Sequence, residues 1–177
     1  MTATDRIGVV SGTHSTAAQA AIAASVAAWR AAGAKVAGVL SEEHDLPDRS
    51  CGAGYLRDIA SGERFAIYRD IPAVASSACH LDAEGVEAAC AAVLRQISAS
   101  DLVVFNKFGK LEAMHQGLWQ AFEAAVTAGK PALLALSEKH SEAFRAFAPG
   151  AAYLAPDRTV LDRWWGAVRK TQGARER

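Results

Sequence analysis

The segment with the most chemical potential is DLVVFNKFGKLEA, residues 101–113. Its first apolar residues predict a buried strand, and Asn106, Lys107, Lys110 and Glu112 follow within seven positions. In open α/β sheets, ligands bind outside the carboxyl ends of the strands. Ammonium and amide groups at such an edge are suited to anions. The segment therefore predicts one half of an anion site, with Asn106, Lys107 and Lys110 as donors.

A second candidate is the stretch SGTHST, residues 11–16, between an apolar run and an alanine-rich helical pattern. A helix that begins there directs free backbone N–H groups and a positive dipole end at whatever lies in front of it. A glycine leaves space for the ligand, and hydroxyl and imidazole groups add donors. The candidate anion-binding residues of this stretch are Gly12, Thr13, His14, Ser15 and Thr16.

Each stretch also has a simpler interpretation. Ser and Thr before a helix are ordinary capping residues, and two lysines after a strand are typical of a solvated loop. Glu112 and His115 lie close to the presumed pocket and could support it, although Glu112 could equally cap a helix or form a local ion pair. The residues leave these alternatives open.

Metal sites and covalent catalysis are not predicted. The cysteines Cys51, Cys79 and Cys90 lack the close pairing of zinc ligands, and their odd number argues against a disulfide framework. No G-x-S-x-G nucleophile motif is present, and no catalytic residue is predicted. Turn chemistry is enough to explain Asp58, which flanks the segment ASGE.

Short apolar strands alternate with helical patterns along the chain, which predicts an α/β domain with a mainly parallel sheet and helices on both faces. A β-hairpin insertion is expected around ASGE. We expect one domain over residues 1–170 and a charged, frayed tail over 171–177. The expected strands are 6–11, 34–41, 101–105 and 131–137, and the expected helices are 12–33, 82–98, 115–129, 141–148 and 157–170.

The overall charge is balanced, with 19 basic and 19 acidic side chains. This gives no general attraction to nucleic acid or to an anionic membrane, so neither is expected as a partner. No apolar run approaches the roughly 18 residues of a membrane span. The start of the chain lacks the pattern of a signal peptide, and a cytoplasmic location is expected.

Several motifs resemble known proteins. RIGVVSGTHSTAAQ, YLRDIASGERFAI and DLVVFNKFGKLEA follow the order of motifs in the thermophile nucleoside-triphosphatase family, which has a small P-loop fold. LRDIASG, CHLD, NKFGKLEA, AGKPALLAL and FRAFA more closely resemble bacterial family 2478 of the domains of unknown function. The resemblance implies a three-layer P-loop-like fold. Members of that family are often encoded near molybdate-uptake genes, which implies a role in handling molybdate or tungstate.

The chain departs from a working P-loop enzyme at both essential motifs. If residues 8–15 are aligned with G-x-x-x-x-G-K-[ST], Thr13 replaces the second glycine and His14 replaces the lysine. Asn106 and Lys107 stand where the resemblance implies a magnesium-binding Asp and a catalytic Glu. Two negative charges are thus replaced by one positive charge, so magnesium-dependent hydrolysis is not expected.

The leading hypothesis is a non-hydrolysing binder of a small anion. Molybdate or tungstate is favoured by the resemblance, and sulfate, phosphate or a nucleotide remains open. One alternative is an atypical nucleoside-triphosphatase or nucleotide phosphatase. Another is an interaction module without a ligand, in which Trp119, the Trp164–Trp165 pair and the hairpin supply an apolar contact surface. A homo-oligomer is a further possible partner arrangement.

Overall fold

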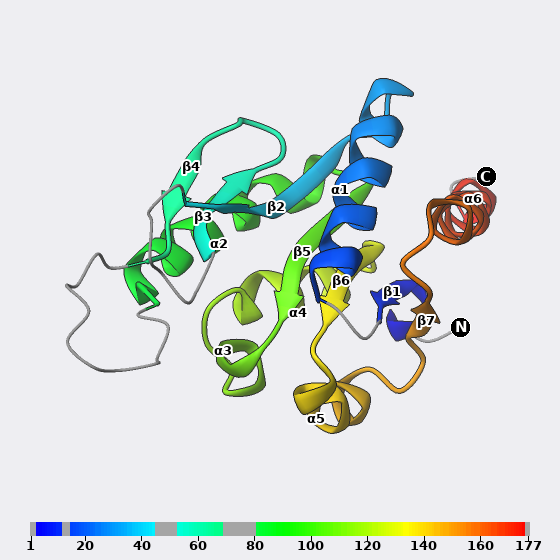
Figure 1. Ribbon diagram of the computed structural model, residues 1–177. Helices are drawn as coiled ribbons and strands as arrows, with labels where there is room; N and C mark the ends of the chain where they lie inside the picture. Colours follow the sequence, from blue (N-terminus) through cyan, green and yellow to red (C-terminus); the bar gives the residue numbers. More distant parts are fainter. Residues whose placement is uncertain (1–2, 12–14, 45–52, 69–80, 176–177) are drawn as a thin grey trace, which may run out of the picture.

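The computed structural model describes residues 3–11, 15–44, 53–68 and 81–175. Its seven-stranded sheet has the order β4-β3-β2-β5-β6-β1-β7 (Figure 1). The strands are β1 (Ile7–Val10), β2 (Val36–Glu43), β3 (Ala53–Asp58), β4 (Arg64–Ala66), β5 (Leu102–Phe108), β6 (Ala132–Leu136) and β7 (Ala152–Leu154). The α-helices are α1 (Ser15–Ala31), α2 (Ala83–Gln96), α3 (Lys110–Ala113), α4 (Trp119–Thr127), α5 (Ser141–Phe147) and α6 (Arg158–Arg175). Short 3₁₀ turns are η1 (Ala3–Arg6), η2 (Ile97–Ala99) and η3 (Glu138–His140).

The centre of the sheet is parallel. β2 pairs with β5, β5 with β6, and β1 lies between β6 and β7, all in parallel register. β3 and β4 extend the sheet beyond β2 as an antiparallel hairpin. The four residues of β1 and the five of β6 are all buried, as expected for strands covered on both faces.

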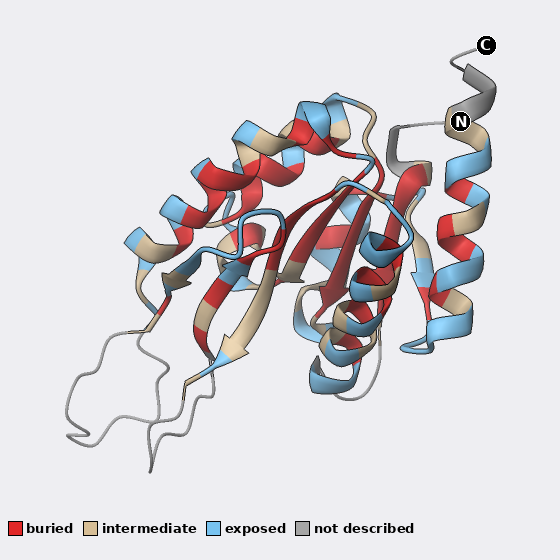
Figure 2. Ribbon diagram, turned by 90° about the horizontal axis from the view of Figure 1, so that it is seen from above, coloured by how far each residue is buried: buried red, intermediate tan, exposed pale blue. Residues whose placement is uncertain are grey.

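Helices cover both faces of this sheet. On one face, Ile22 of α1 and Leu161 of α6 share a core with Val104 and Leu133. On the other face, α2, α4 and α5 pack over Val103 and Leu134, with Val93, Phe122 and Phe144 in the same cluster. The central strands are buried, while exposed positions lie on the outer sides of the helices (Figure 2). The expected mainly parallel sheet with a hairpin and two helical layers is confirmed.

Element ends differ from the expected ones where local geometry intervenes. The helix expected from residue 115 begins at Trp119, because His115 and Gly117 both have positive φ angles and interrupt helical geometry. The helix α6 continues to Arg175, into the segment expected as a frayed tail.

The strand β5 also runs further than expected, through Asn106 and Lys107 to Phe108. Its pairing with β6 shifts register between Phe105 and Lys107. Phe105 and Phe108 consequently lie in the same core cluster, whereas residues three apart on a regular strand face opposite sides. This bulge sets the positions of the polar residues at the end of β5.

Candidate functional site at the carboxyl edge of the sheet

The two candidate loops follow β1 and β5, whose carboxyl ends lie on one edge of the sheet. They are not direct neighbours, because β6 lies between β1 and β5. Two strand spacings amount to about 10 Å. The end of β6 therefore lies between the ends of the two strands that lead into these loops.

Asn106 is held by the neighbouring strand. Its Oδ1 accepts a hydrogen bond from the Ser41 backbone N–H over 3.1 Å. The Ser41 hydroxyl in turn donates to Gln19 Oε1 over 3.3 Å. All three side chains are partly buried. This polar chain, the Gln19–Ser41–Asn106 network, links an early turn of α1 to the carboxyl ends of β2 and β5.

Sequence reasoning missed Gln19 and Ser41. The two residues are 22 positions apart, and Ser41 and Asn106 are 65 apart. A glutamine within an alanine-rich helix and a serine at the end of a strand carry no local signal of a shared site. The pairing of β2 with β5 brings Ser41 to Asn106, and the packing of α1 on β2 brings Gln19 to Ser41.

The cationic candidates remain available at this edge. Lys107 is partly buried in β5, opposite Ala135 of β6. Lys110 is exposed at the start of α3, and Thr16 is exposed in the first turn of α1. Within the described residues neither lysine forms an ion pair. Their charges are therefore not neutralised by a carboxylate of the described chain.

Part of the first candidate loop cannot be placed against these groups. Gly12, Thr13 and His14 lie outside the described residues. Ser15 is the first residue of α1. The side-chain geometry of this half of the site therefore stays a prediction.

Glu112 is occupied by its own loop. It is 9% exposed, and its Oε2 accepts the Gly109 N–H over 3.0 Å while its Oε1 accepts the Leu118 N–H over 3.1 Å. Gly117 lies close by with φ of 64°, and a Cβ added there would lie 2.8 Å from Glu112 Oε1. The local capping role, one of the alternatives for Glu112, is the one the structure shows.

His115 is held against α4. Its ring stacks on Trp119 with centroids 4.3 Å apart and planes 12° apart, while the residue as a whole is exposed. Trp119 itself is only 8% exposed and contacts Phe108, Phe122 and Phe147. This packing orients the imidazole by an aromatic contact.

The tryptophans expected as a contact surface belong to the core. Trp164 and Trp165 are 8% and 4% exposed and pack against α1, where Trp29 stacks at a tilt on Trp165. The prediction that Trp119, Trp164 and Trp165 form an apolar contact surface is therefore wrong, because all three side chains are buried.

Two further properties concern metals and membranes. Across residues 3–11, 15–44, 53–68 and 81–175, no group of three or more His, Cys, Asp and Glu side chains lies close enough to hold a metal ion. Cys90 is buried in this part of the chain, and burial raises the pKa of its thiol. Cys51 and Cys79 lie outside the described residues. In the same ranges no helix is both long and apolar enough to span a bilayer.

Comparison with known proteins adds two findings. A family model described as "Protein of unknown function (DUF2478)" matches residues 7–164. The "Molybdenum import ATP-binding protein ModC 2" of Bradyrhizobium diazoefficiens is 36% identical over 138 residues. That match covers 76% of this chain and 15% of the relative. No solved structure matches the chain significantly.

Proposed function

The chain belongs to the DUF2478 family and has a three-layer α/β fold of the P-loop type, and from this premise we propose that it binds a small oxyanion without hydrolysing a nucleotide. The observation that carries the proposal is the end of β5. There an amide held by Ser41 and a lysine that forms no ion pair with the described residues occupy successive positions.

The donor set at this edge suits an anion better than a magnesium-bound triphosphate. Magnesium prefers carboxylate and water oxygens. Asn106 carries no charge, and its Oδ1 already accepts a hydrogen bond from a backbone N–H. Both carboxylate oxygens of Glu112 accept hydrogen bonds from backbone N–H groups of its own loop. Lys107 and Lys110 instead offer ammonium donors, to which the start of α1 adds backbone N–H groups and the Thr16 hydroxyl.

Molybdate or tungstate is the favoured ligand. A tetrahedral dianion is small enough to lie between the start of α1 and the end of β5, and its oxygens accept several N–H and O–H donors. The name of the Bradyrhizobium relative refers to molybdenum import, which supports a role for this chain in molybdenum handling. Because the match covers only 15% of that relative, the activity of the whole relative is not carried over.

Calorimetric titration tests the proposal. The purified protein is titrated with molybdate, tungstate, sulfate, phosphate, ATP and ADP, each with and without magnesium. We expect an oxyanion to bind with an affinity that magnesium does not increase. Tight ATP binding that requires magnesium would contradict the proposal, and the absence of any binding would favour an interaction module.

A matched pair of variants then locates the site. Lys107→Ala removes a charge-assisted contact of the kind worth about 1.5–3 kcal/mol, so we expect affinity to fall at least about tenfold. Lys35→Ala is the control, because Lys35 is exposed just before β2, at the opposite edge of the sheet. Equal affinity of wild type and Lys107→Ala would remove Lys107 from the site.

An atypical nucleoside-triphosphatase is the second candidate, because the Bradyrhizobium relative is named as ATP-binding. Metal-dependent phosphate release by the wild-type protein would favour it. Turnover that disappears in Lys107→Ala but persists in Lys35→Ala would assign that activity to the same edge.

A further inference from the structure

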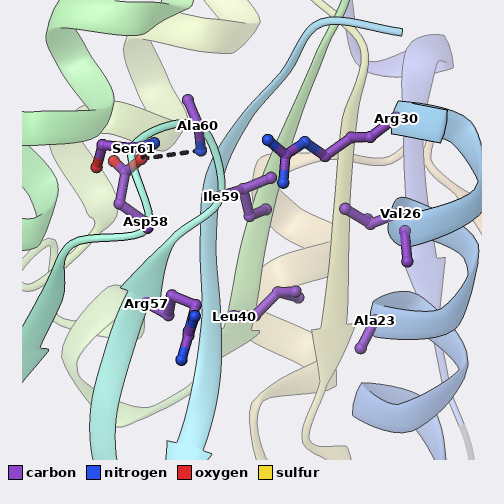
Figure 3. A pocket seen from close by; sticks show the side chains of 11 residues that line it. Ala23, Val26, Arg30, Leu40, Arg57, Asp58, Ile59, Ala60 and Ser61 are labelled. Carbon is purple, nitrogen blue, oxygen red and sulfur yellow. Dashed lines mark hydrogen bonds between the residues drawn. The ribbon is translucent and has the colours of Figure 1, made fainter. Parts of the chain in front are cut away.

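A second concave site lies between α1 and the turn that joins β3 to β4 (Figure 3). It is a groove of about 290 Å³ that is open to solvent. Ala23, Val26 and Ala27 line it from α1, and Leu40 and Ile59 line it from β2 and the hairpin turn. We call this the α1–hairpin groove.

The groove is separate from the carboxyl edge. It uses the second half of α1, and its hairpin side begins where Leu40 pairs with Arg57 and Val39 with Asp58. Positions 23, 26, 27 and 30 recur on one face of the helix and span about 10 Å. The two exposed or partly exposed alanines on that face leave room for the main chain of an incoming segment.

The hairpin wall of the groove is fixed before anything binds. The Asp58 side chain is fully buried, and its Oδ1 accepts the N–H groups of Ala60 and Ser61 over 2.9 and 2.7 Å. Its Oδ2 accepts Gln96 Nε2 over 2.7 Å, which ties the turn to α2 on the other face. A preorganised wall loses little conformational entropy when a partner docks.

Charge at the rim indicates the occupant. The Arg30 side chain extends from α1 across the groove toward Ile59 (Figure 3), and within the described residues it forms no ion pair. Arg57 and Arg64 share one carboxylate, Glu42, and Asp58 is turned into its own hairpin. Glu63 is the exposed acidic residue that follows the turn. The groove therefore offers an apolar floor beside an unpaired guanidinium.

The size of the groove favours a protein segment over a small cofactor. Small-molecule pockets usually enclose about 300–1,000 Å³ and bury most of the ligand. This groove is at the lower limit and open, which suits one or two anchoring side chains. In the Bradyrhizobium relative the matched segment is 15% of the chain, so that segment is covalently joined to a much longer polypeptide there.

We propose that the α1–hairpin groove docks a segment of a partner protein that carries an aliphatic side chain next to an acidic residue. The aliphatic group packs on Val26, Leu40 and Ile59, and the carboxylate pairs with Arg30. This site acts independently of the oxyanion edge, so loss of either activity leaves the other measurable.

A random 12-residue peptide library displayed on phage is selected on the wild-type protein, and enriched peptides are synthesised and measured by fluorescence anisotropy. We expect them to share an aliphatic residue beside Asp or Glu. Affinity should fall at least about tenfold in Ala27→Arg, which fills the groove, and in Arg30→Glu, which reverses its charge. Arg95→Glu on α2 is the matched charge control, and we expect it to stay within about twofold of wild type.

Several outcomes would overturn the proposal. These are no enrichment, peptides rich in basic residues, and peptides that bind Ala27→Arg as tightly as wild type. Self-association that Ala27→Arg abolishes, measured by sedimentation, would instead assign the groove to a second copy of the chain. Thermal unfolding of each variant establishes that it is folded before binding is compared.

Discussion

Two turns of this protein, residues 58–63 and 109–118, are each built around one buried carboxylate, but they are anchored differently. Asp58 bonds to Ala60 and Ser61 in its own turn and to Gln96 on a distant helix. Among the described residues, the Glu112 carboxylate bonds to Gly109 and Leu118, both within its own loop. The Asp58 carboxylate thus ties the hairpin turn to α2, whereas the Glu112 carboxylate ties together the two ends of the loop after β5.

The comparison shows that a buried acidic residue near a candidate site can have a structural role in its own turn. In each turn a buried carboxylate accepts two backbone N–H groups, and a buried carboxylate would be costly to leave without such donors. Neither Asp58 nor Glu112 is therefore a free acid for metal or proton chemistry. Among the described residues of the carboxyl edge, Lys107 and Lys110 form no ion pair, and the proposed anion site rests on these two lysines.

The largest effect is expected at the long-range anchor. Asp58→Ala leaves the N–H groups of Ala60 and Ser61 and the Gln96 amide without their acceptor. We expect unfolding free energy to fall by about 3 kcal/mol, measured by urea denaturation. A loss below about 1 kcal/mol would mean that the hairpin turn does not depend on its carboxylate.

The local anchor should matter less. Glu112→Ala removes the acceptor of two hydrogen bonds, whereas Asp58→Ala removes the acceptor of three, one of which reaches a distant helix. We expect a loss of about 2 kcal/mol in the same urea titration. A loss larger than that of Asp58→Ala would reverse the comparison between the two turns.

Alanine substitutions at two glycines distinguish the cost of a steric clash from the cost of a left-handed backbone conformation. Gly117 and Gly129 have φ angles of 64° and 65°, but only at Gly117 would a Cβ meet neighbours, at 2.8 Å from Glu112 Oε1 and 3.0 Å from Leu111 Cβ. Both alanine variants should lose about 1 kcal/mol from the left-handed conformation.

Gly117→Ala should lose about 1 kcal/mol more than Gly129→Ala, because its new methyl group displaces the Glu112 carboxylate. Equal thermal unfolding midpoints for the two variants would show that the loop moves aside without cost.

The smallest change in stability is expected at the uncharged acceptor. Asn106→Asp keeps an oxygen for the Ser41 N–H, so unfolding free energy should change by less than about 1 kcal/mol. The added negative charge lies next to Lys107 in β5, and we expect oxyanion affinity to fall several-fold in calorimetry. Unchanged affinity would mean that the anion binds away from the end of β5.

Much of the fold follows from short-range pattern. IGVV and ALLAL are short continuous apolar runs, typical of strands buried on both faces, and Gly33 and Gly129 follow helices in the left-handed conformation expected of them. The bulge in β5 is different, because it depends on the pairing of that strand with β6. No pattern within NKFG distinguishes a strand that continues from one that stops.

The sequence predicts which residues are candidates for the site, but not which hydrogen bonds hold them. Asn106 and Lys107 stand out because polar residues follow a buried run. The Asn106 side chain accepts the backbone N–H of Ser41 on another strand. The Ser41 hydroxyl in turn donates to Gln19 on a helix. Such contacts are fixed by strand order, which a single sequence does not encode locally.

The place of β1 in the sheet has a consequence for how the protein is made. Ile7 pairs with Ala132, and Gly8 pairs with Ala152, so the first strand joins the sheet only through residues from the last third of the chain. Contacts this distant along the chain form late, because a long loop must close first. During synthesis, the strand that leads into the candidate anion loop waits without a neighbour until β6 has left the ribosome.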